Sequence, residues 1–343
     1  MKQGLRRATQ IIAATIAGGL LITTTGCSQS SSSSSPSANA DSTSSSPISV
    51  VASVNQWGSL AEQIGGDDVK VTSILSTTTV DAHDFEPTAA DIATLQDSAV
   101  AVLNGAGYDT WASKNLGKDV ITVSAADMVG ATDGDNPHLW FSKDARDAVA
   151  KELSEAFAKA LPDKKDDFAT RLSAWQKKED TLESSMSEFT QKHPDATYAA
   201  TEAVAYYLMA DLGFQDVTPK GYAQSAASES EPAATDVQEF QELLEAKKAN
   251  LLINNTQEAS DATNMITGTA GRSDIPVISI SEQMPEGTSD LTEWITNLVK
   301  EISDALTSAS SDQSSSPSSG TDDSSTSTST ETPSNEGQTD PGK

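Results

Sequence analysis

The feature that most constrains the fold is an alternation of short apolar runs with helical patterns, which occurs twice along the chain. Early in the chain, β-branched runs at Ile48–Val54 and Val69–Leu75 alternate with segments whose apolar residues are three or four positions apart. The pattern returns later with runs at Thr197–Ala200, Asn250–Ile253 and Ile275–Ile280. Buried parallel strands have continuous apolar sequences, and strands that alternate with helices are typical of βαβ units. The sequence therefore predicts an α/β protein in which mainly parallel sheets are flanked by helices.

The two α/β regions are separated by a long helical segment that contains no strand. Its pattern starts at Ser142, a residue type that often caps helices, and continues to about Gln191 with an interruption near Pro162. A connector between two lobes explains such a segment more simply than a third domain does. The expected parts are an N-terminal lobe over residues 48–141, a connecting helix over 142–192 and a C-terminal lobe over 193–306.

The N-terminus has the layout of an export signal. Basic residues precede an apolar run from Ile11 to Ile22, which is short for a transmembrane helix, and small residues follow it. The single cysteine, Cys27, comes next, and a lone thiol in an exported protein cannot form an internal disulfide. The stretch resembles a bacterial lipoprotein signal, so we predict a signal peptide over residues 1–26 and lipidation of Cys27. The alternative is an ordinary signal peptide with an incidental cysteine.

Two Ser-rich segments flank the expected fold. Residues 27–47 and residues 307–343 consist largely of Ser, Thr, Pro, Asp and Gly, and they contain too little apolar surface to form a core. We therefore predict a disordered tether that joins the lipidated cysteine to the fold, and a disordered tail after it.

The chain is strongly acidic, with 50 acidic against 22 basic side chains and a formal charge of −28. A field of this sign repels polyanions, which argues against nucleic acid and anionic membrane surfaces as ligands. It favours the capture of cations, although it also keeps many secreted proteins soluble.

Four side chains are placed where an α/β fold binds its ligands, beyond the carboxyl ends of the strands. His83, Glu202 and Glu282 each follow an expected strand, and His138 follows a strand–helix unit. Two imidazoles and two carboxylates form a neutralising set for one divalent ion. In the alternative reading, the glutamates are solvated loop acids and His138 packs against Trp140.

The remaining polar residues near these candidates receive other roles. Asp81, Asp84 and Glu86 surround His83 and are expected to orient its imidazole or to cap the loop rather than to bind metal. The third histidine, His193, lies between two expected elements and is expected to be a surface residue.

Five motifs occur in order through the folded part of the chain. They are Asp81–Thr88 (DAHDFEPT), Leu103–Asp109 (LNGAGYD) with Trp111, Asn136–Trp140 (NPHLW), Thr201–Leu208 (TEAVAYYL) and Ile275–Glu282 (IPVISISE). Together they resemble the metal-binding (zinc/manganese) solute-binding lipoproteins of bacterial ABC transporters, a family that includes the streptococcal adhesin-type lipoproteins. The resemblance implies two α/β lobes joined by one long rigid helix.

The resemblance also implies a ligand set. His83 and His138 correspond to metal ligands of the family, and Glu202 stands where zinc receptors typically have His and manganese or iron receptors have Glu. The fourth ligand is usually Asp, whereas this chain has Glu282 at the matching place. Oxygen-rich ligation favours hard ions such as Mn²⁺, whereas raw affinity favours Zn²⁺. The set therefore leans slightly toward Mn²⁺.

The expected function is that of an extracytoplasmic substrate-binding component of an ABC importer. Such a protein captures Mn²⁺ or Zn²⁺ as its transported ligand and delivers it to a permease that works with an ATPase. We expect a monomer, anchored through Cys27 on the outer face of the bacterial cytoplasmic membrane and without enzymatic activity. The alternatives are a surface adhesin and, less favoured, a metallohydrolase, for which the sequence has neither an HExxH helix nor a G-x-S-x-G elbow.

Overall fold

The computed structural model describes residues 46–80, 82 and 85–314. Several sequence-based predictions fall on residues outside this description: the signal peptide, Cys27, most of the tether, His83 with its neighbours Asp81 and Asp84, and residues 315–343 of the tail. For these residues the predictions stay predictions.

The N-terminal lobe is built on a four-stranded parallel sheet with the strand order β2-β1-β3-β4. Its strands are β1 (Ile48–Val54), β2 (Val69–Leu75), β3 (Val100–Leu103) and β4 (Ile121–Ser124). The elements between and after them are α1 (Asn55–Gly65), a 3₁₀ turn (Gly66–Asp68), α2 (Ala89–Gln96), α3 (Thr110–Ser113), α4 (Ala125–Val129) and a second 3₁₀ turn (Leu139–Phe141). The central strand β1 is buried at six of its seven residues, as its β-branched sequence predicts.

The C-terminal lobe repeats this plan, with a second four-stranded parallel sheet in the order β6-β5-β7-β8. Its strands are β5 (Thr197–Ala200), β6 (Gln215–Asp216), β7 (Leu251–Asn255) and β8 (Val277–Ile280). Its helices are a 3₁₀ turn (Ala203–Ala205), α7 (Tyr206–Asp211), α8 (Lys220–Ala227), α9 (Ala234–Glu245), α10 (Asp261–Arg272) and α11 (Leu291–Ser314). The predicted α/β architecture with two mainly parallel sheets is therefore confirmed.

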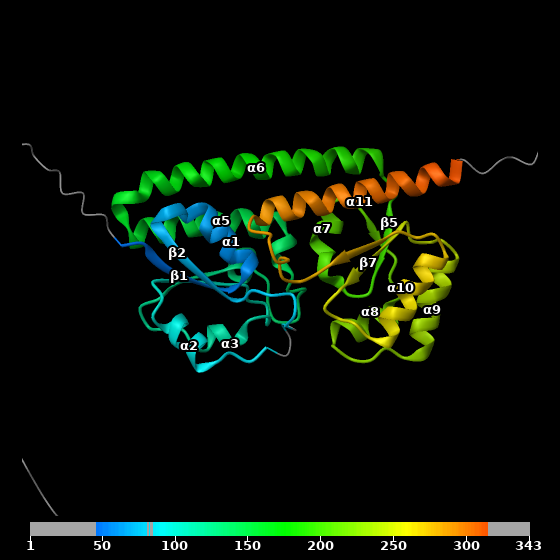
Figure 1. The fold of residues 1–343 in the computed structure, drawn as a ribbon, viewed down its shortest axis with the longest axis horizontal. Coiled ribbons are helices and arrows are strands. Elements are labelled where there is room, and N and C mark those ends of the chain that lie inside the picture. Colours follow the sequence, from blue (N-terminus) through cyan, green and yellow to red (C-terminus); the bar gives the residue numbers. More distant parts are fainter. Residues whose placement is uncertain (1–45, 81, 83–84, 315–343) are drawn as a thin grey trace, which may run out of the picture. The chain divides into compact units, whose positions relative to one another are not determined.

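The segment expected to form one connecting helix is a hairpin of two helices. α5 (Lys143–Ala160) and α6 (Lys165–Lys192) are joined by a 3₁₀ turn over Pro162–Lys164 and pack against each other. Leu161 is non-helical because the following proline ring disfavours the α conformation, so the chain can reverse there. α5 packs on α1 and α4 of the N-terminal lobe, and α6 alone continues to the second lobe (Figure 1).

The structure sets the bounds of three further helices. α2 begins at Ala89, directly after Thr88, whose side chain forms a capping box with Asp91. Ser124 caps α4, which is only five residues long and therefore too short to show a helical period in the sequence. α11 continues to Ser314, past the end of the fold expected at Leu306, so the first residues of the expected disordered tail are helical.

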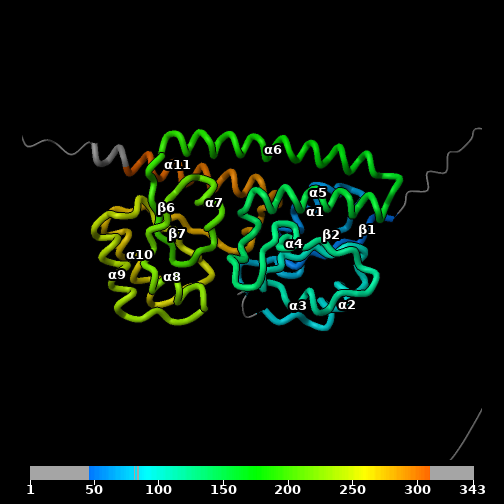
Figure 2. Tube along the Cα trace, turned by 180° about the vertical axis from the view of Figure 1, so that it is seen from behind, coloured from blue at the N-terminus to red at the C-terminus, as the bar shows by residue number. Residues whose placement is uncertain are grey.

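One apolar core is continuous from the first sheet to the second. It includes Val50 of β1 and Ile253 of β7, with the fully buried Trp57 and Trp140. α6 contributes one apolar face with the spacing that the sequence predicts: Phe168, Trp175, Leu182, Met186 and Phe189. α11 lies beside α6 (Figure 2). Within the described part of the chain, the helices include none that is both long enough and apolar enough to cross a membrane.

Candidate metal centre

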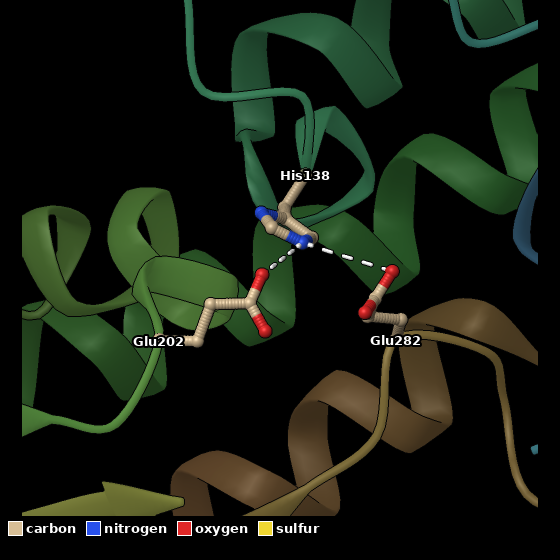
Figure 3. Close-up of side chains that lie close together, drawn as sticks. All are labelled: His138, Glu202 and Glu282. Atoms are coloured by element: carbon tan, nitrogen blue, oxygen red, sulfur yellow. Dashed lines mark ion pairs between the residues drawn. The ribbon is translucent and has the colours of Figure 1, made fainter. Parts of the chain in front are cut away.

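Three of the four predicted ligands lie together. His138, Glu202 and Glu282 each present one ligand atom, and these atoms all lie within 4.8 Å of one another (Figure 3). The Nε2 atom of His138 is 3.4 Å from Oε1 of Glu202 and 3.9 Å from Oε2 of Glu282. The fourth predicted ligand, His83, lies outside the described residues.

The strand order explains why the two glutamates meet. Glu202 follows β5 and Glu282 follows β8, so both leave the carboxyl edge of the second sheet. From β5 the chain goes first to β6, on one side of β5, and then to β7, on the other side of β5. In open α/β sheets, ligands bind at the carboxyl edge where such a switch of direction occurs. His138, which lies immediately before a 3₁₀ turn of the N-terminal lobe, reaches both carboxylates at this edge.

The imidazole of His138 is oriented by Asn136. Oδ1 of Asn136 accepts the backbone N–H of His138 at 3.0 Å and lies 3.0 Å from its Nδ1. Nδ2 of Asn136 donates to the carbonyl of Ala203 at 2.7 Å, which identifies the oxygen and nitrogen of this amide. Because an amide oxygen can only accept, Nδ1 of a neutral ring carries the proton and Nε2 carries the lone pair. The nitrogen that faces both carboxylates is thus the one able to bind a metal.

Glu282 is fully buried and its carboxylate is held from both lobes. Oε2 accepts the hydroxyl of Tyr108 at 2.5 Å, and Oε1 accepts Nδ2 of Asn255 at 3.1 Å. Burial and the charge of Glu282 raise the pKa of Tyr108 well above its usual range, so the phenol keeps the proton that it donates. Nε2 of Gln283 donates to the same phenol oxygen at 2.9 Å.

Asn255, the last residue of β7, bridges the two glutamates. Its Nδ2 donates to Oε2 of Glu202 and to Oε1 of Glu282, while its Oδ1 accepts the backbone N–H of Gln257 at 3.0 Å. Gln257 in turn accepts the backbone N–H of Glu282 at 2.8 Å. The ends of β7 and β8 are therefore tied together around the carboxylates.

The site joins the two lobes. Nδ2 of Asn55, at the start of α1, donates to the carbonyl of Met284 at 3.0 Å, and its Oδ1 accepts the backbone N–H of Met284 at 3.1 Å. Gln56 donates to the carbonyl of Glu282. The hydroxyl of Tyr207 donates to the carbonyl of Asn136 at 2.9 Å. Residues from both lobes thus hold the loops that carry the candidate ligands.

The chemistry of the site suits a divalent cation. Burying two carboxylates close together costs free energy unless positive charge compensates them, and a divalent ion supplies charge of the required size. Zn²⁺ bonds of about 2.0–2.1 Å place neighbouring tetrahedral ligand atoms about 3.4 Å apart. The distance of 3.4 Å between Nε2 of His138 and Oε1 of Glu202 matches this ligand–ligand distance, and the 3.9 Å between Nε2 of His138 and Oε2 of Glu282 is close to it.

Sequence reasoning missed the residues that support the ligands. Tyr108 belongs to a recognised motif but received no role, and Asn255 and Gln257 were not singled out. Asn255 could have been found by the same rule that found the glutamates, because it ends a buried strand at the same sheet edge. Glu86, expected to help to orient His83, is exposed. His193 is half-buried and packs on Phe189 with ring centroids 4.7 Å apart.

The chain is similar in sequence to metal-binding lipoproteins. The zinc-binding lipoprotein AdcA of Streptococcus pneumoniae is 24% identical over 247 residues, which cover 65% of this chain and 48% of AdcA. The manganese-binding lipoprotein MntA of Bacillus subtilis is 26% identical over 284 residues, which cover 78% of this chain and 84% of MntA. The chain thus spans about half the length of AdcA and most of the length of MntA.

The fold is also that of solved metal-binding proteins. The structure of the periplasmic zinc-binding protein TroA from Treponema pallidum superposes with a TM-score of 0.65 at 19% identity, over 76% of this chain and 99% of TroA. The family described as "Zinc-uptake complex component A periplasmic" matches residues 50–305, a range that covers nearly all of both lobes and contains all three clustered side chains. With this match over most of its length, the chain belongs to the zinc-uptake component A family.

Proposed function

We propose that this protein is the substrate-binding component of an ABC importer and that it captures Zn²⁺ or Mn²⁺ at the interface of its lobes. The observation that carries the proposal is the cluster of His138, Glu202 and Glu282, in which an oriented imidazole nitrogen faces two carboxylates. Relatives named for zinc and for manganese binding support both ions. The metal is cargo, so the site binds and releases it rather than using it in catalysis.

We propose that His83 completes the ligand set. The support comes from the sequence, where His83 follows β2 and lies in the DAHDFEP motif. Gln257, whose Oε1 accepts the backbone N–H of Glu282, also donates from its Nε2 to the carbonyl of Val80 at 3.0 Å. The backbone that leads to His83 is therefore attached to the loops around the candidate metal centre.

We propose that the importer consists of a permease and an ATPase, and that this chain works as a monomer on the outer face of the cytoplasmic membrane. Lipidation of Cys27 would anchor it there, and the Ser-rich tether would let the lobes reach the permease. A mass shift of the N-terminal peptide after expression in a lipoprotein-processing bacterium, abolished by Cys27→Ala, tests the anchor. An unmodified N-terminal peptide containing Cys27 would contradict it.

Metal analysis of the purified chain tests the binding site. We expect about one equivalent of Zn²⁺ or Mn²⁺ per chain, because the described residues contain one such cluster. His138→Ala and Glu202→Gln should weaken binding by more than the roughly 10–100-fold that changes outside the ligand shell produce. His193→Ala and Glu286→Gln are matched controls, since both residues lie outside the cluster. Equal metal affinity in the ligand variants and the controls would refute the proposal.

For the adhesin alternative, the support is a similarity of fold to a solved adhesin structure. A structure described as the laminin-binding protein of Streptococcus agalactiae, with adhesin and metal-transporting activity, superposes with a TM-score of 0.63 at 19% identity. Binding to immobilised laminin that persists in His138→Ala would show an interaction independent of metal.

A further inference from the structure

The amide of Asn255 contacts both proposed carboxylate ligands. An amide nitrogen carries two protons, and Nδ2 donates to Oε2 of Glu202 and to Oε1 of Glu282. The side chain cannot turn over, because its Oδ1 accepts the N–H of Gln257 and would otherwise face two negative charges. Asn255 is also only 1% exposed, so water does not readily replace these contacts.

In each glutamate, Asn255 holds one oxygen and the other oxygen is directed at the imidazole. In Glu202, Oε2 is held by Asn255 and Oε1 lies 3.4 Å from Nε2 of His138. In Glu282, Oε1 is held by Asn255, while Oε2 accepts the hydroxyl of Tyr108 and lies 3.9 Å from the same nitrogen. To chelate an ion with both oxygens, either carboxylate would have to turn its second oxygen, which Asn255 holds, toward the ion.

We infer that Asn255 is a positioning residue that holds Glu202 and Glu282 so that each offers one oxygen, and that it thereby determines which metal the site prefers. This inference rests on the proposed function and names its source of selectivity. Tyr108 helps to fix the same carboxylate from the other lobe: its hydroxyl donates to Oε2, so Glu282 is held at both oxygens and cannot turn freely.

The physical basis is the number of ligand atoms. Zn²⁺ in closed protein sites takes four ligands, whereas ions such as Mn²⁺ suit six oxygen-rich positions. Each carboxylate that chelates adds an oxygen to the shell of the ion. By opposing chelation, Asn255 favours the ion with the smaller shell and counteracts the preference that carboxylate oxygens have for harder ions. Removing the amide should therefore shift the site from Zn²⁺ toward Mn²⁺.

The test compares Asn255→Ala with the matched control Asn254→Ala in the purified chain. Asn254 is the preceding residue of β7, and its Oδ1 accepts the hydroxyl of Thr201 at 3.3 Å rather than contacting a glutamate. The affinities for Zn²⁺ and Mn²⁺ are measured separately by competition with chelators. Co²⁺ serves as the spectroscopic probe, because four-coordinate Co²⁺ absorbs visible light more strongly than six-coordinate Co²⁺.

We expect Asn255→Ala to lose about 10–100-fold in Zn²⁺ affinity, the range for residues that orient metal ligands, and only a few-fold in Mn²⁺ affinity. The visible absorption of bound Co²⁺ should fall, while the control keeps the wild-type values. Equal losses for both ions, or an unchanged Co²⁺ spectrum, would overturn the inference and leave the proposed function standing. A wild-type chain that binds neither ion would instead overturn the proposed function, and the inference with it.

Tyr108→Phe provides a second test that does not depend on the folding of Asn255→Ala. It removes one hydroxyl and keeps the ring, which packs against Trp140 with centroids 5.3 Å apart. Without the hydroxyl, the carboxylate of Glu282 can turn more easily, so the Zn²⁺/Mn²⁺ affinity ratio should fall as in Asn255→Ala, by a smaller factor. A ratio that rises or stays at the wild-type value would contradict the positioning role.

Discussion

The buried ion pair between Arg146 of α5 and Glu179 of α6 yields the sharpest stability prediction. Arg146 is 1% exposed and Glu179 is 3% exposed. Nε and Nη2 of Arg146 donate to Oε2 of Glu179 at 3.1 and 2.9 Å, and the hydroxyl of Thr292 in α11 donates to Oε1 at 2.7 Å. Nη1 of Arg146 donates to the carbonyl of Trp140 at 3.1 Å, two residues after His138. The pair thus joins three helices to the loop that carries a candidate ligand.

Glu179→Leu would leave the guanidinium buried without its counter-charge. Breaking a buried pair on one side costs about 3–5 kcal/mol, whereas replacing both partners with apolar residues is often close to neutral. We therefore expect Glu179→Leu and Arg146→Met each to lose about 3–5 kcal/mol of unfolding free energy, and the double variant to lose less than either. At about 2–4 °C per kcal/mol for a domain of this size, each single variant should melt roughly 6–20 °C lower.

Urea unfolding followed by circular dichroism, evaluated as a double-mutant cycle, measures these changes. Glu183→Leu is the control, because this residue also lies on α6 but its side chain is 57% exposed in an ion pair with Lys143. Additive losses in the double variant, or single losses below about 1 kcal/mol, would refute the argument that desolvated charge dominates here.

Two further predictions concern the N-terminal lobe. Ala106 has a φ of 51° and lies between two glycines that also have positive φ. The left-handed conformation costs a residue with a side chain roughly 1–2 kcal/mol. Ala106→Gly should therefore raise the unfolding free energy, measured by urea titration, by about 0.5–1 kcal/mol. The hydrogen bond from Arg171 holds the pKa of Asp68 below its usual range, so the ion pair stabilises the fold above the unfolded-state pKa of about 3.9. Asp68→Asn should therefore lower the melting temperature at pH 7, and the difference should shrink as the pH falls through the folded-state pKa.

Each of these predictions has a matched comparison. Ala93→Gly, in the exposed interior of α2, should destabilise by about 1 kcal/mol, opposite in sign to Ala106→Gly. A loss at Ala106 as well would show that its packing outweighs the backbone strain. For Asp68, the comparison is Asp67→Asn in the same 3₁₀ turn. A difference between wild type and Asp68→Asn that grows as the pH falls would contradict the assigned sign.

Local sequence determined most of the secondary structure and the place of the site. The runs that became β1, β2, β5, β7 and β8 are β-branched or apolar because both faces of a parallel sheet are covered, so their pattern reveals them without knowledge of their partners. Parallel strands end at a common edge, which is why Glu202 and Glu282 could be assigned from their positions after two strands. His138 was placed only approximately by pattern, and more firmly by family resemblance.

Tertiary structure alone decided what surrounds those ligands. The reversal between α5 and α6 depends on packing with α1, and a helical pattern does not show whether two consecutive helices continue or fold back. The contacts of Glu282 with Tyr108 and Asn255 span 174 and 27 residues of sequence. No local preference encodes such pairs, because they arise only when the lobes close a common core. The sequence thus determined which candidate ligands are available and at which edge they lie, and the packing of the lobes decided which oxygen of each glutamate faces the imidazole of His138.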